Sequence, residues 1–145
     1  MALRCPSLAA IRRATAGDAA DGTIRLLFVR EGGRVGLVQT PQEAANEVDQ
    51  FLALYLERMI TDVAAAGVVV AVHRHDGRPS YADRQLWVML GARLAPTPTT
   101  LLDLVVVGAP QVWSARRGRP LIPPRRRRAN QQTAARRSAS RATAR

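Results

Sequence analysis

Apolar residues gather in short runs near the start of the chain, and two of these runs predict a pair of strands. Thr23–Val29 (TIRLLFV) is almost continuously apolar, which is typical of a buried strand. Glu31-Gly32-Gly33 follows as a turn, and Arg34–Gln39 (RVGLVQ) runs back from it. This pattern predicts a β-hairpin.

The next stretch carries apolar residues at helical spacing between residues 44 and 63. Thr40 is expected to be the N-cap, Pro41 fits the first helical position, and Glu43 completes a capping box. Gly67 is expected to end the helix. We therefore predict one long, largely apolar helix that packs across the sheet.

The second half of the chain predicts three more strands and one more helix. Val68–Val72 is wholly apolar, as expected of a central strand. A helix is predicted over about Tyr81–Leu94, then a strand over Leu101–Val107 and a short edge strand over Gln111–Ala115. The order strand, strand, helix, strand, helix, strand, strand predicts an α/β fold with a mixed sheet.

Charge divides the 145-residue chain into two parts. Residues 1–114 hold eleven arginines and eleven carboxylates, whereas residues 115–145 hold eleven arginines and no acid, so the net charge of +11 belongs to the second part. We expect residues 1–21 to form a loose lead-in, residues 22–115 to form the domain, and residues 116–145 to be a disordered arginine-rich tail.

Composition narrows the class of protein further. The single cysteine, Cys5, excludes an internal disulfide and a cysteine-based zinc site, and it fits a cytoplasmic protein. No apolar run has the length of a membrane span, so we expect no membrane partner. All 22 basic residues are arginine.

The main candidate for chemistry follows the predicted central strand. His73 and His75 are two residues apart, and residues at this spacing in a strand point to the same face. Asp83 lies in the first turn of the next predicted helix. Two imidazoles and a carboxylate form a three-ligand zinc set with an open fourth position, which is typical of a hydrolytic site.

Each of these residues also has a structural interpretation. Ser80 and Asp83 have the spacing of a helix capping box, which by itself favours a cap over a catalytic role. His73 and His75 are equally well explained as loop residues after a strand. Asp76 is a candidate turn residue before Gly77, a substitute metal ligand, or a partner for an imidazole N–H.

Three motifs in order resemble the RadC-like branch of the JAB/JAMM (MPN) metalloprotein family. They are VHRHDGRPSYAD (72–83), LLDLVVVG (101–108) and VWS (112–114), and the resemblance covers roughly residues 22–115. It implies a cytidine-deaminase-like (MPN-type) fold with zinc held by His73, His75 and Asp83.

The resemblance also implies a reaction. Ser80 would stabilise the oxyanion of a tetrahedral intermediate, and the zinc would activate water to cleave an amide or isopeptide bond. The chain departs from the family, however, because the segment between His75 and Ser80 is shorter and Leu104 replaces a histidine. The family's catalytic glutamate also has no clear counterpart, since Asp21 and Gly22 fall nearest to its place.

Two function classes therefore stand side by side. The first is a zinc metallohydrolase. The second is a catalytically inactive JAB scaffold that binds a partner protein, or that binds nucleic acid through the tail, with Arg125, Arg126, Arg127 and Arg128 at its centre. The tail is also explained as a solvated extension without a partner. No aromatic residue lies among the tail arginines, so base stacking is not expected.

Overall fold

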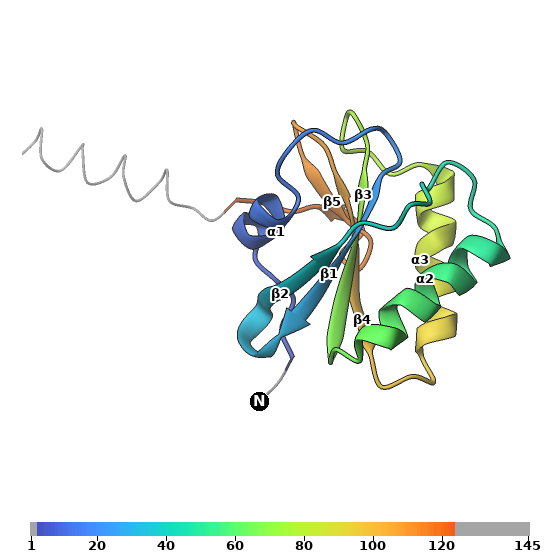
Figure 1. Cartoon of the computed structure of the whole chain (residues 1–145). Coiled ribbons are helices and arrows are strands. Elements are labelled where there is room, and N and C mark those ends of the chain that lie inside the picture. The colour runs from blue at the N-terminus through green and yellow to red at the C-terminus, as the bar shows by residue number, and fades with distance from the viewer. Residues whose placement is uncertain (1–2, 124–145) are drawn as a thin grey trace, which may run out of the picture.

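Six strands form one mixed sheet with the spatial order β2-β1-β3-β4-β5-β6. The computed structural model describes residues 3–123 (Figure 1). The strands are β1 (Ile24–Arg30), β2 (Arg34–Gln39), β3 (Gly67–His73), β4 (Thr100–Val107), β5 (Val112–Ser114) and β6 (Arg119–Pro120). The helices are α1 (Leu8–Ala14), α2 (Gln50–Val63) and α3 (Tyr81–Leu94). The prediction of an α/β domain with a mixed sheet is confirmed.

The first two strands form the predicted hairpin. β1 and β2 pair antiparallel, and the short 3-10 helix η1 (Glu31–Gly33) connects them. Gly32 and Gly33 have φ angles of 74° and 78°, a left-handed conformation that glycine adopts without steric cost. A bulge lies between Phe28 and Val29.

β3 lies at the centre of the sheet, as its apolar sequence predicts. All seven of its residues are buried. It pairs antiparallel with β1 and parallel with β4, which it reaches through α3. His73 therefore pairs with Val107 at the edge where β3 and β4 both end. In α/β sheets, ligands bind at the carboxyl ends of the parallel strands.

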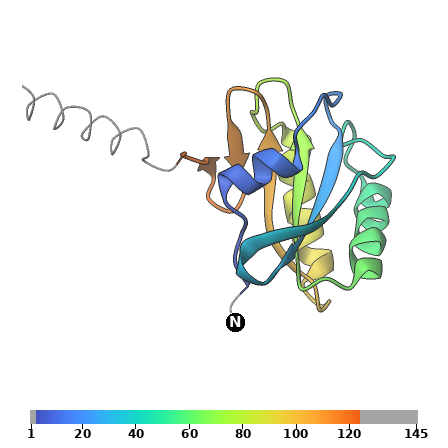
Figure 2. The ribbon, with the colours of Figure 1, turned by 60° about the vertical axis from the view of Figure 1, so that its left-hand side comes forward.

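The helices cover the two faces of the sheet unequally. α2 and α3 lie on one face, and the shorter α1 lies on the other (Figures 1 and 2). Val68, Val70 and Val72 of β3 belong to the core cluster that contains the buried leucines of α2 and α3. Val69 and Ala71 belong to the cluster that contains Ile11 of α1. Odd- and even-numbered residues of β3 thus face different helices.

The long helix starts later than the sequence predicts. α2 begins at Gln50 rather than near Thr40, and its N-cap is Asp49, whose carboxylate accepts a 2.9 Å hydrogen bond from the Leu52 amide. The preceding segment does not enter the helix because its backbone pairs elsewhere. The Ala45 amide donates to the Gly22 carbonyl at 2.7 Å, next to a bridge between residues 23 and 44.

Both ends of the domain extend beyond residues 22–115. The hydroxyl of Ser7 accepts a hydrogen bond from the Ala10 amide and caps α1, whose Ile11 is fully buried. At the other end, β6 pairs with β5 through Pro120. No helix of the part that the structure describes is long and apolar enough to cross a bilayer.

Candidate functional site

The end of β3 sends neighbouring side chains to opposite faces of the sheet. His73 continues the odd-numbered series that faces α1, and Arg74 continues the even-numbered series that faces α2 and α3. Asp83 lies in the first turn of α3. The side chain that the strand directs toward Asp83 is therefore that of Arg74.

Arg74 and Asp83 form a two-pronged ion pair. The Arg74 Nε atom donates to Oδ2 of Asp83 at 3.0 Å, and Nη2 donates to Oδ1 at 2.7 Å. The Asp83 side chain is fully buried, and that of Arg74 is 11% exposed. The hydrogen bond to Asp83 is the main cause of a raised pKa for Arg74. Bidentate pairs of this kind are the strong form of an arginine–carboxylate contact.

Arg74 also contacts two other segments of the domain. Its Nη1 atom lies 3.2 Å from Oδ2 of Asp21, in the loop before β1, and Nη2 donates to the Ala45 carbonyl at 2.6 Å. Asp21 in turn accepts a 3.0 Å hydrogen bond from the His75 amide. The Arg74 side chain thus connects the loops before β1 and α2 to the end of β3 and the first turn of α3.

Ser80 and Asp83 form the capping box that their spacing predicts. The Ser80 hydroxyl accepts a 3.2 Å hydrogen bond from the Asp83 amide, and Oδ2 of Asp83 accepts a 2.9 Å hydrogen bond from the Ser80 amide. The structural interpretation of this pair is confirmed. The oxyanion role of Ser80 stays a prediction.

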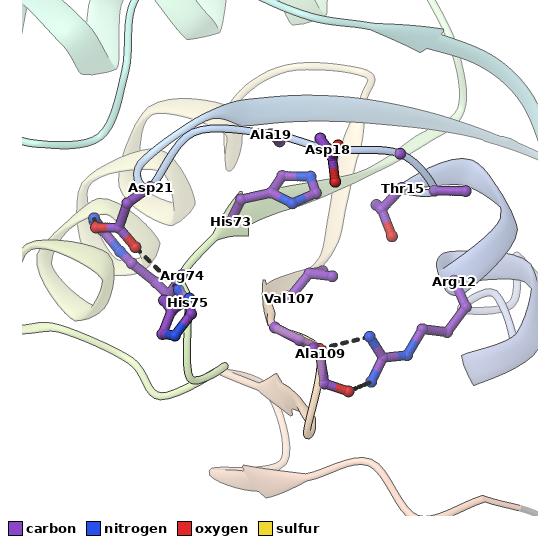
Figure 3. A pocket seen from close by; sticks show the side chains of 13 residues that line it. Arg12, Thr15, Asp18, Ala19, Asp21, His73, Arg74, His75, Val107 and Ala109 are labelled. Carbon is purple, nitrogen blue, oxygen red and sulfur yellow. Dashed lines mark hydrogen bonds and ion pairs between the residues drawn. The ribbon is translucent and has the colours of Figure 1, made fainter.

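The two histidines have different surroundings. His73 is 8% exposed, and its buried Nε2 atom has no hydrogen-bond partner among residues 3–123. Burial, and then the positive charge of Arg25, lower its pKa, which favours the neutral imidazole. His75 lies beyond the strand and is exposed. In Figure 3 the ring of His73 points toward Thr15 and Asp18, whereas the ring of His75 lies on the side of Arg74.

A cavity of about 460 Å³ lies at the carboxyl ends of β3 and β4 (Figure 3). Its walls are the end of α1 with the loop that follows, the His73–His75 segment, and residues 107–109 at the end of β4. The Arg12 guanidinium closes one side by donating to the carbonyls of Gly108 and Ala109 at 2.6 and 3.4 Å. Asp83 does not line this cavity.

The arrangement does not fit a zinc ion held by His73, His75 and Asp83. Both oxygens of Asp83 are bonded to Arg74, and one is also bonded to the Ser80 amide. His73 faces the opposite layer of the sheet. No three His, Cys, Asp or Glu side chains within residues 3–123 are grouped so that they would hold a metal. Zinc binding by the three predicted ligands stays a prediction that this geometry does not favour.

The sequence motifs LLD and VWS meet in a second buried polar group. The Ser114 hydroxyl donates to Oδ2 of Asp103, whose Oδ1 accepts a 3.0 Å hydrogen bond from the Arg116 amide. Burial is the largest cause of a raised pKa for Asp103. Asp103 and Ser114 are almost fully buried, so their role here is to hold β5 and the turn after it against β4.

The basic residues of the tail are described only at its beginning. Arg116, Arg117 and Arg119 are exposed, and no carboxylate of residues 3–123 forms an ion pair with them. The predicted nucleic-acid-binding residues Arg125–Arg128 lie outside the described residues.

No protein-family model matches the chain, and no curated protein is significantly similar to it in sequence. The resemblance to the RadC-like branch therefore rests on the three motifs alone.

Proposed function

We propose that the chain is a non-catalytic JAB/MPN-like scaffold that binds nucleic-acid backbones through its arginine-rich segment, residues 116–145. The ion pair between Arg74 and Asp83 is the observation that supports a non-catalytic role. A carboxylate that neutralises a buried guanidinium is not free to coordinate a metal. Removing it from that guanidinium would leave Arg74, which is 11% exposed, with Asp21 as its remaining charged partner, and would cost the two hydrogen bonds of the buried pair.

The distribution of charge supports the nucleic-acid half. Residues 115–145 carry eleven arginines and no carboxylate, so their charge is not cancelled within the segment. Arginine binds phosphate oxygens through two parallel N–H groups and keeps its charge at any physiological pH. The segment contains no aromatic residue that would stack on bases. We therefore expect binding that follows phosphate charge and ignores base sequence.

Anisotropy titrations of short labelled duplexes with the full chain test this function. Two duplexes of unrelated sequence are expected to bind with equal affinity, because the contacts are to phosphates. With six to ten such contacts, the affinity falls roughly 10³- to 10⁵-fold between about 50 and 200 mM salt. Absence of binding at the lower salt concentration would refute the proposed function.

A further inference from the structure

Charge is divided between the two faces of the sheet. The α2–α3 layer and the loop leading into α2 carry six of the eleven carboxylates and, on the two helices, three arginines. The carboxylates are Glu43, Glu47, Asp49, Glu57, Asp62 and Asp83, and the arginines are Arg58, Arg84 and Arg93. The opposite face is covered by α1. The last turn of this helix contains Arg12 and Arg13, and its first turn contains no acidic residue. The folded domain is close to neutral overall, but its α1 face is basic.

Three exposed arginines surround a hollow between α1 and the β1–β2 turn. Arg4 precedes α1, Arg13 lies on it, and Arg34 begins β2. All three line a hollow of about 760 Å³ whose other walls contain no carboxylate. None of the three forms an ion pair within the part of the chain that the structure describes. Their guanidinium groups are therefore available to an external anion.

A second hollow with three arginines adjoins the first. Arg116, Arg117 and Arg119 line it, and its volume is about 290 Å³. Cys5 and Ser7 line both hollows, so the two lie on either side of the segment that leads into α1. The one carboxylate in the second hollow, Asp103, is 1% exposed and already bonded to Ser114.

The last described residues bring the arginine-rich segment to this face. β6 and the residues that follow it pass beside α1 in both ribbon views (Figures 1 and 2). Leu8 and Ile122 line the same hollow, which confirms that the two segments lie side by side. The described part of the arginine-rich segment, residues 116–123, therefore ends beside these hollows.

We propose that the α1 face binds the phosphate backbone of a nucleic-acid duplex, with the hollow of Arg4, Arg13 and Arg34 extending the contacts made by residues 116–145. This inference rests on the proposed function and adds a defined surface of the folded domain to it. Phosphate oxygens suit the site because three guanidinium groups line one hollow whose walls contain no carboxylate.

The test compares two triple variants of the full chain that carry the same net charge. The first replaces Arg4, Arg13 and Arg34 with glutamine. The control replaces Arg58, Arg78 and Arg84, which are exposed residues of α2, of the loop before α3 and of α3. Circular dichroism establishes that both variants are folded, and duplex binding is then measured against salt concentration.

The α1-face variant is expected to lose about three units of the slope of log affinity against log salt, one for each phosphate contact removed. The control variant is expected to retain the wild-type slope. Equal slopes for the two variants would overturn the α1 face while leaving the proposed function intact. If the wild-type chain bound no duplex, the proposed function and this inference would both fail. A different outcome is an α1-face variant that loses binding to phosphatidylserine vesicles while it binds the duplex as the wild-type chain does. That result would assign the face to a lipid surface and overturn the inference.

Discussion

Replacing Arg74 with alanine is expected to lower the free energy of unfolding by about 3–5 kcal/mol, because it leaves a buried carboxylate without its counter-charge. Asp83 is fully buried, and Arg74 also anchors Asp21 and the Ala45 carbonyl. Urea unfolding followed by tryptophan fluorescence measures the loss. A domain of this size has about 5–15 kcal/mol of stability in total, so the effect is large.

A double variant separates the ion pair from the other contacts of Arg74. Arg74→Ala with Asp83→Asn removes both charges and keeps a side-chain acceptor at the third position of the capping box. This variant is expected to be more stable than Arg74→Ala alone, because no uncompensated charge remains. A loss below about 1 kcal/mol for the single variant, which is typical of an exposed ion pair, would contradict the buried pair described here.

Replacing Arg125, Arg126, Arg127 and Arg128 with glutamine is expected to remove the largest share of duplex binding. Each arginine that leaves a phosphate lowers the salt slope by about 0.9, so four of them lower it by roughly 3 to 4. The affinity lost between about 50 and 200 mM salt then shrinks by roughly 10²-fold relative to the wild-type chain. The same anisotropy titrations of the full chain measure both quantities.

The matched control for this variant keeps the charge. Lysine at the same four positions is expected to preserve the salt slope, since a point charge still displaces counterions. An unchanged slope in the glutamine variant would mean that these four residues do not contact phosphates. The contacts would then have to come from the other arginines of residues 116–145.

The strands and the last helix were predictable because their signals are local. Each signal involves only a few consecutive residues. The structure contains the apolar strand β3, the turn at Glu31–Gly33 and the Ser80–Asp83 cap. The start of α2 was not predictable in the same way. Thr40 and Asp49 are both good N-caps, and the choice between them depends on backbone pairing between residues 22–23 and 44–45.

The site was predicted less well because its key contact is not local. The sequence draws attention to His73 and His75, and the arginine between them was missed. The alternation of side chains along a strand could have identified Arg74. Residue 74 is even-numbered, like Val68, Val70 and Val72, which face α3. That Asp83 would be neutralised by Arg74 also depends on the fold, because it requires β3 and α3 to meet at their ends.

The packing of α1 was hidden for a related reason. One apolar residue, Ile11, is fully buried on this short helix, so its sequence lacks the periodic pattern of a core helix. Without α1, the sequence gives no reason to place Arg4 and Arg13 beside Arg34. The basic face exists only once the hairpin and α1 are brought together.

Elemental analysis of the purified full chain, expressed with added zinc, decides most directly whether this domain is a scaffold or a metalloenzyme. A His73→Ala/His75→Ala variant prepared in parallel is the reference for non-specific metal. We expect both proteins to carry the same trace amount of zinc. Both oxygens of Asp83, the carboxylate that the ligand set requires, already accept hydrogen bonds from Arg74. Stoichiometric zinc in the wild-type chain that is lost in the variant would contradict the non-catalytic scaffold.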